Sequence, residues 1–194
     1  MACSYNMSMK YLIFIFFIAC STPKSKLESD AKCLKALASK KIVAPNGVES
    51  MGVYSNLVQE GDVFTGYKIR IVKRRDYCQG LILEYNQSLE PQLYSISNLF
   101  ECEESLSTLS MDTKLGFYSP FSDSAPEDFY FGFDGRLDSS DRLIGHISFP
   151  SNDLKGRAEK TKVSFEPGPK DQASMAAFDW EIIERLKLKR ACFR

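Results

Sequence analysis

The stretch FYFGFD, residues 129–134, decides the fold class of this 194-residue chain. Its three phenylalanines occupy every second position, and tyrosine, glycine and aspartate lie between or after them. Successive side chains of a β-strand point to opposite faces of a sheet, so this alternation predicts a strand with one apolar face. Aromatic residues also favour strands. We therefore expect Phe129, Phe131 and Phe133 to lie in the core of a β-rich domain.

Extended runs separated by turn residues lie on both sides of this stretch. The longest, residues 63–72, follows the turn at Gly61-Asp62, and Asp134-Gly135 and residues 138–141 have the composition of turns. Further strands are predicted at residues 81–85, 93–100, 115–118, 143–149 and 161–165. About eight strands at this spacing predict a mainly β fold, an antiparallel sandwich or barrel.

Helical spacing is clearest before these strands, at residues 27–41. Leu27, Ala31 and Leu34 share one face at spacings of three and four, which predicts one N-terminal helix. The C-terminal segment 178–190 is ambiguous. Its even positions are mostly apolar and its odd positions mostly charged. A period of two with a bulge at Ile183-Glu184 fits better than a helix, so we predict a long strand.

The start of the chain has the order of an export signal. Lys10 is followed by eight apolar residues at 11–18, and then by the small Ala19 and by Cys20. A membrane-spanning helix needs about 20 apolar residues, so this run is too short to be one. Met9 is a candidate start, because Met-Lys followed by an apolar run is a compact form of such a signal.

Residues 17–20, Phe-Ile-Ala-Cys, resemble the lipobox of bacterial lipoproteins, with phenylalanine where leucine is usual. The resemblance covers residues 9–26. It implies that Cys20 receives diacylglycerol, that cleavage occurs before Cys20, and that the new amino terminus is acylated. We expect a signal peptide at 1–19, a lipidated cysteine with a flexible tether at 20–26, and a single β-rich domain at 27–194. The alternative is an ordinary cleaved signal, with Cys20 discarded or free.

Four further cysteines remain once Cys3 and Cys20 are assigned to the leader and the lipid. An even number in an exported chain favours two disulfides over a zinc site, and no Cys-x-x-Cys pair is present. The predicted strands 81–85 and 93–100 form a hairpin about residues 90–92. Cys78 and Cys102 are symmetric about that turn, so we predict that they are bonded. Cys33 and Cys192 are then left to join the ends of the domain.

Composition excludes several functional classes. The 25 Lys and Arg equal the 25 Asp and Glu, so charge gives no general attraction to nucleic acid. His146 is the only histidine, and it alternates with Ile147 and Phe149, so we expect it to face solvent. A single exposed histidine argues against Ser-His-acid or Cys-His catalysis. We expect no catalytic residue, no cofactor and no metal, with a calcium site at Asp134, Asp138 and Asp141 as the disfavoured alternative.

Two basic runs are candidates for a binding surface. The first is residues 68–75, with Lys73-Arg74-Arg75 at its end, and the second comprises Arg185, Lys187, Lys189 and Arg190. If neighbouring, they would form one positive patch able to contact anionic polymers or acidic lipid head groups. The favoured alternative is a solvated face whose charge is balanced by acids elsewhere.

These observations predict an exported lipoprotein anchored to a membrane of the cell envelope. We expect a non-catalytic binding or structural role, without naming the ligand or protein partner. One alternative is a barrel that carries a small apolar ligand in a cavity lined by Phe129, Phe131 and Phe133. A second is an envelope enzyme, which the lone His146 makes the least favoured.

Overall fold

The computed structural model describes residues 23–102, 106–149, 159–168 and 173–193. Cys20 and the leader lie outside these ranges. The described elements are the helices α2 (Pro23–Ala38) and α3 (Ala173–Cys192) and the strands β1 (Val48–Ser55), β2 (Val58–Glu60), β3 (Val63–Arg74), β4 (Tyr77–Ser88), β5 (Leu93–Glu101), β6 (Leu109–Phe117), β7 (Glu127–Leu137), β8 (Leu143–Phe149) and β9 (Glu159–Pro167).

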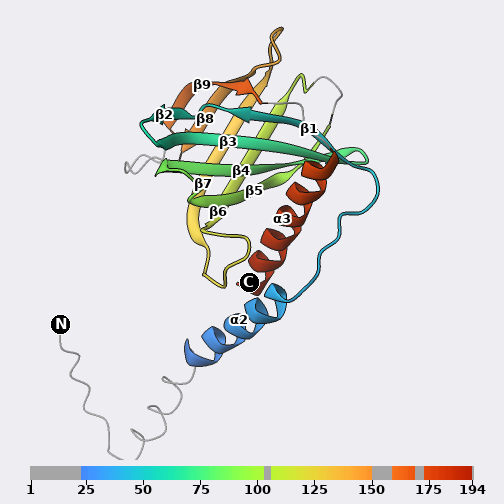
Figure 1. The fold of residues 1–194 in the computed structure, drawn as a ribbon, viewed down its shortest axis with the longest axis vertical. Helices are drawn as coiled ribbons and strands as arrows, with labels where there is room; N and C mark the ends of the chain where they lie inside the picture. The colour runs from blue at the N-terminus through green and yellow to red at the C-terminus, as the bar shows by residue number, and fades with distance from the viewer. Residues whose placement is uncertain (1–22, 103–105, 150–158, 169–172, 194) are drawn as a thin grey trace, which may run out of the picture.

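The strands form a closed antiparallel barrel (Figure 1). Neighbours in the chain pair from β3 through to β9, and β1 closes the barrel because it pairs with both β3 and β9. The short strand β2 is an addition beside β3. The prediction of a mainly β antiparallel fold is therefore confirmed. The predicted turn at Asp134-Gly135 is wrong, because β7 continues through it and pairs there with His146 and Gly145.

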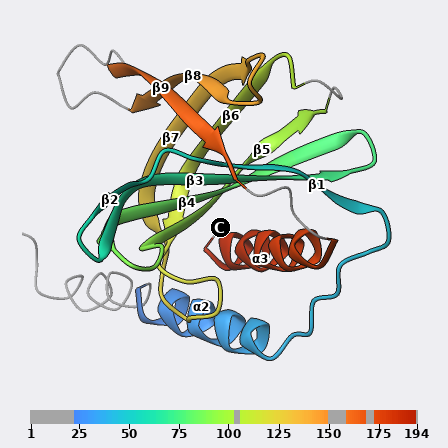
Figure 2. The same ribbon diagram turned by 45° about the horizontal axis from the view of Figure 1, so that its top comes forward.

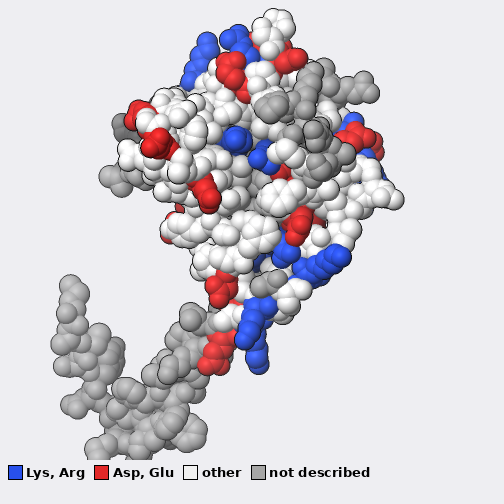
Figure 3. Space-filling view, viewed as in Figure 1, with Lys and Arg blue, Asp and Glu red and all other residues white. Residues whose placement is uncertain are grey.

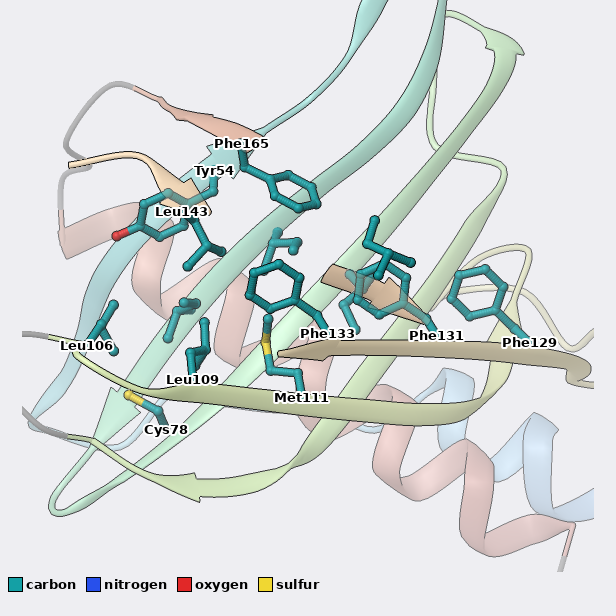
Figure 4. Packing of buried hydrophobic residues seen from close by; sticks show 14 residues of the cluster. Tyr54, Cys78, Leu106, Leu109, Met111, Phe129, Phe131, Phe133, Leu143 and Phe165 are labelled. Atoms are coloured by element: carbon teal, nitrogen blue, oxygen red, sulfur yellow. The ribbon is translucent and has the colours of Figure 1, made fainter. Parts of the chain in front are cut away.

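The barrel interior is filled with apolar side chains (Figure 4). Phe131 and Phe133 are each 1% exposed, and Phe129 is 7% exposed, as the alternation predicts. The centre of the Phe131 ring lies 5.2 Å from the centre of the Tyr67 ring, and the centre of the Phe133 ring lies 5.6 Å from that of Phe165. We call the buried set the interior cluster: Tyr54, Ile69, Ile71, Cys78, Ile82, Leu106, Leu109, Met111, Phe129, Phe131, Phe133, Leu143, Ile147 and Phe165.

Helix α3 packs against the outside of the barrel, and α2 lies beyond it (Figure 2). Between α3 and the barrel wall lies the outer cluster: Val72, Leu81, Leu83, Tyr85, Ile96, Phe117, Trp180, Ile182, Ile183 and Leu186. The predicted C-terminal strand is therefore wrong. The wall and the surrounding segments bury side chains on several sides of α3, including the polar Asp179, Arg185 and Lys189. Burial of polar positions obscures the period that an amphipathic helix usually has.

The predicted N-terminal helix is confirmed as α2, which begins at Pro23 and thus includes the last residues of the predicted tether. Cys33 of α2 is bonded to Cys192 at the end of α3, with their Cα atoms 5.8 Å apart. Leu34 of α2 is buried. The guanidinium of Arg185 donates a hydrogen bond to the carbonyl of Lys40, 3.3 Å away. These contacts attach α2 to α3.

The β4–β5 hairpin brings Cys78 and Cys102 to bonding distance, with their Cα atoms 5.4 Å apart. The predicted register is shifted by two, since Cys78 lies opposite Phe100 rather than opposite Cys102. A bulge between Gln79 and Leu81 shifts the pairing once more. The bond is therefore diagonal across the open end of the hairpin, within reach of two cysteine side chains.

Candidate functional site

A groove lies between the β3–β4 hairpin and helix α3, and we call it the Trp180 groove. Its volume is about 270 Å³. Tyr77 and Leu99 are exposed at its edge, at 53% and 59%. Its lining residues are Val72, Arg74, Arg75, Tyr77, Cys78, Gln79, Leu99, Trp180, Glu184 and Lys187. The groove therefore combines cationic and apolar side chains on a surface open to solvent.

Trp180 makes cation–π contacts with two of the cationic side chains. The guanidinium carbon of Arg74 and the ammonium nitrogen of Lys187 each lie 5.3 Å from the centre of its ring. Cations at this distance from an indole are attracted by its π-electrons. Lys187 is also paired with the Glu184 carboxylate at 2.7 Å, which offsets its charge. Neither Arg74 nor Arg75 forms an ion pair with a carboxylate in the described part of the chain.

The hairpin that carries the two arginines is fixed by its own turn, by a backbone hydrogen bond and by a disulfide. Arg75 has a φ of 57°, the left-handed conformation found in tight hairpin turns. The N–H of Cys102 donates a hydrogen bond to the carbonyl of Asp76 at 3.1 Å, and the Cys78–Cys102 bond lies directly after the turn. A fixed hairpin favours binding, because less side-chain and backbone freedom is lost when a ligand arrives.

A second hollow of about 350 Å³ lies next to the groove. Arg74 and Arg75 line both, and Lys73 and Glu49 are added here; the remaining lining residues are Asn46 and Gly47. Four cations and two carboxylates thus line the two hollows together. This excess of positive charge suits an extended anionic ligand that crosses the hairpin.

Gln79 contributes a buried amide to the groove wall. Its Nε2 donates a hydrogen bond to the carbonyl of Ser97 at 2.8 Å. Its Oε1 is buried and accepts no hydrogen bond from any residue that the structure describes. An unpaired buried acceptor is destabilising by about 1–3 kcal/mol. A ligand that donates a hydrogen bond to Oε1 would therefore remove this cost.

The structure brings together only part of the two predicted basic runs. Residues 73–75 and Lys187 meet at the Trp180 groove. Arg70 instead pairs with the buried Asp179 at 2.7 Å, and Arg185 pairs with Glu181 at 2.8 Å. The single positive patch, which is the less favoured interpretation and requires both runs to be neighbours, is therefore limited to the hairpin and one lysine. Sequence reasoning missed Trp180, whose place beside the hairpin depends on the helical geometry of α3.

Lys189 is buried and stabilises the fold through hydrogen bonds to a loop. Its ammonium donates hydrogen bonds of 2.8 Å to the carbonyls of Ser119 and Ser122, and lies 5.1 Å from the centre of the Phe117 ring. Burial lowers the pKa of Lys189 to about 8, and the nearby Asp123 carboxylate opposes this shift. Lys189 thus fixes the loop that follows β6 to the last turns of α3.

The remaining predicted positions lie apart from the groove. His146 is exposed on β8 beside the buried Ile147, as predicted. Asp134 accepts a hydrogen bond from the Ser110 hydroxyl at 2.8 Å. Asp138 accepts hydrogen bonds from the Arg142 guanidinium, which lowers the pKa of that carboxyl. Among the described residues, no three metal-ligating side chains are grouped so that they could hold an ion.

One end of the barrel carries another hollow, of about 350 Å³, with Tyr54 and Asp141 in its wall. The other lining residues are Ser50, Met51, Gly52, Val53, Leu137, Pro167 and Gly168. Phe129, Phe131 and Phe133 are packed against other rings instead. The cavity required by the carrier alternative is thus occupied by side chains at this part of the interior.

Neither of the two described helices is long and apolar enough to cross a membrane. No family model matches the sequence, no curated protein matches it, and no solved structure matches it.

Proposed function

We propose that this protein is an exported lipoprotein of the cell envelope, anchored through Cys20, whose barrel binds an anionic partner at the Trp180 groove. The role is one of binding and not of catalysis. One observation carries the binding role: Arg74 and Arg75 have no carboxylate partner among the described residues. Their hairpin is fixed by the Cys78–Cys102 bond and by the contact between Arg74 and Trp180.

The anchoring part rests on the leader and on the position of helix α2. This helix begins three residues after Cys20 and is covalently joined to α3 through Cys33 and Cys192. A lipid on Cys20 would therefore connect to the barrel through a helix. Two or more acyl chains on one cysteine give stable attachment, since each buried methylene contributes about 0.8 kcal/mol.

Metabolic labelling tests the anchor. Bacterial cells expressing the full chain are grown with radiolabelled palmitate, next to cells expressing Cys20→Ala. We expect label in the wild-type protein and none in the variant. A Cys3→Ala variant is the matched control and should keep its label. Equal labelling of wild type and Cys20→Ala, or no label in either, would reject the anchor.

Binding to a carboxylated sugar polymer tests the groove. Arg74→Ser combined with Arg75→Ser should weaken binding of polygalacturonate roughly tenfold, about 1.4 kcal/mol for two charges near a protein surface. The control, Lys160→Ser with Lys162→Ser, removes two exposed charges from β9 and should leave the affinity unchanged. An equal loss of affinity in both double variants would mean that binding depends only on net charge, and would contradict a specific site at the Trp180 groove.

A further inference from the structure

The outward side of α2 carries a stripe of exposed side chains. A helix turns 100° per residue, which places Glu28, Lys32, Lys35 and Ser39 on one face. All four are exposed. Leu34, in contrast, is buried against the rest of the molecule. This stripe is therefore fixed in orientation by the packing of α2 and by the Cys33–Cys192 bond.

Positive charge is concentrated here. Lys32 and Lys35 are followed by the exposed Lys40 and Lys41. This part of the chain therefore has four lysines and only two carboxylates, those of Glu28 and Asp30. In Figure 3, Lys and Arg side chains lie over α2 and the chain that follows it, with acidic side chains beside them. None of the four lysines forms an ion pair with a carboxylate in the described ranges.

An exposed aromatic side chain lies at the same end of the molecule. Phe121 is 52% exposed, and the Arg185 guanidinium that lies 5.1 Å from its ring also binds the carbonyl of Lys40. Lys189 holds the Phe121 loop against the last turns of α3. Aromatic rings and lysines together are typical of the interfacial region of a membrane.

We infer that Lys32, Lys35, Lys40 and Lys41, which lie on α2 or directly after it and which we call the α2 lysines, dock with Phe121 on the acidic head groups of the membrane that carries the protein. This inference rests on the anchor proposed above. Cys20 is three residues before α2, so its lipid would bring this face to the bilayer. A polybasic segment beside a lipid anchor is attracted to an acidic membrane surface.

This docking would place the Trp180 groove away from the membrane. Trp180 lies twelve residues before Cys192 on α3, about 18 Å along the helix axis. In Figure 1 the β3–β4 hairpin lies beside the N-terminal half of α3, and α2 lies at its other end. The groove would then face partners in the aqueous phase and not the head groups of its own membrane.

Lysine footprinting on vesicles tests the docking. The chain from Cys20 onward, which keeps every described residue, is coupled through its Cys20 thiol to a maleimide lipid. This coupling bypasses cellular acylation, so failure of the anchor and failure of the docking are read separately. Vesicles contain phosphatidylcholine alone or with added phosphatidylglycerol, and acylation of each lysine by an amine-reactive ester is followed by mass spectrometry.

On acidic vesicles we expect Lys32, Lys35, Lys40 and Lys41 to react roughly threefold more slowly than on neutral ones, with the protection lost in high salt. Lys160 and Lys162, on β9, should react equally on both. Lys32→Glu with Lys35→Glu should abolish the protection at Lys40 and Lys41. Equal reactivity of the α2 lysines on the two vesicles would overturn the inference, as would equal protection of the β9 lysines.

Discussion

The interior cluster and the outer cluster hold the same barrel wall from its two sides, but they differ in chemistry. The interior is built from rings and aliphatic side chains, and the rings of Phe131 and Phe133 lie 5.2 and 5.6 Å from their aromatic neighbours. On the outer side, α3 buries Asp179, Arg185 and Lys189 beside Trp180 and Ile183. The interior therefore depends on packing volume, whereas the outer side also depends on each buried polar group keeping its partner.

This difference bears on where a binding site can arise. A filled interior gives the barrel a rigid wall, and the wall supports the hairpin that carries Arg74 and Arg75. The outer side offers cations and aromatic rings at the surface because α3 covers only part of the wall. The Trp180 groove lies at the edge of that cover.

Shortening one side chain in each cluster gives the largest expected effects. Phe133→Ala should lower the free energy of unfolding by about 3–5 kcal/mol, and Ile183→Ala by about 2–4 kcal/mol, because each leaves a cavity among fully buried neighbours. Equilibrium unfolding in urea measures both. Phe178→Ala, at an exposed position of α3, is the control and should change stability by less than about 0.5 kcal/mol.

A loss of under about 1 kcal/mol for Phe133→Ala would mean that the interior is loosely packed. In that case the barrel could admit a ligand, and this outcome would favour the carrier alternative.

The two clusters also differ in how far the sequence predicts them. Residues 129–134 predict a buried strand because phenylalanine occupies every position on one face, so the period of two is unbroken. In α3 the buried positions include Asp179 and Lys189, whose partners Arg70 and the carbonyls of Ser119 and Ser122 lie far away in the sequence. No local pattern reports such partners, so the sequence predicts a strand where the helix lies.

The candidate site is predictable only in part for the same reason. The cations 73–75 stand out as a run, and Cys78 and Cys102 stand out by symmetry. Their register depends on a bulge after Gln79, which leaves no mark in the sequence. Trp180 joins the site through the packing of α3, which places it over the hairpin by tertiary contact alone.

Breaking the buried ion pair tests how strongly the outer side depends on its polar partners. Asp179→Ala leaves the Arg70 guanidinium against α3 without this carboxylate, and should destabilise the fold by about 2–4 kcal/mol. Replacing both partners, Arg70→Met with Asp179→Leu, should recover most of the loss. Thermal and urea unfolding check both variants. Equal destabilisation by the single and double variants would contradict a dominant role for the unpaired charge.

The smallest expected effect is a difference in pH dependence between the two clusters. The pKa of Lys189 is lowered to about 8 by burial, from an ordinary value near 10.5. Between these values the unfolded chain binds more protons at this site than the folded one, so stability rises with pH. Below pH 8 the lysine is charged in both states and its burial penalty is complete.

Lys189→Met removes this titration and keeps a side chain of similar length. Between about pH 7 and 9.5, the wild-type protein should gain about 1–2 kcal/mol of stability relative to the variant. The variant loses two hydrogen bonds to the loop at every pH, so the test is the slope of the difference and not its size. Phe133→Ala, in the interior, should run parallel to wild type over the same range. Parallel curves for Lys189→Met as well would mean that the outer side holds no buried titrating lysine, and the contrast between the two sides of the barrel wall would then be one of packing alone.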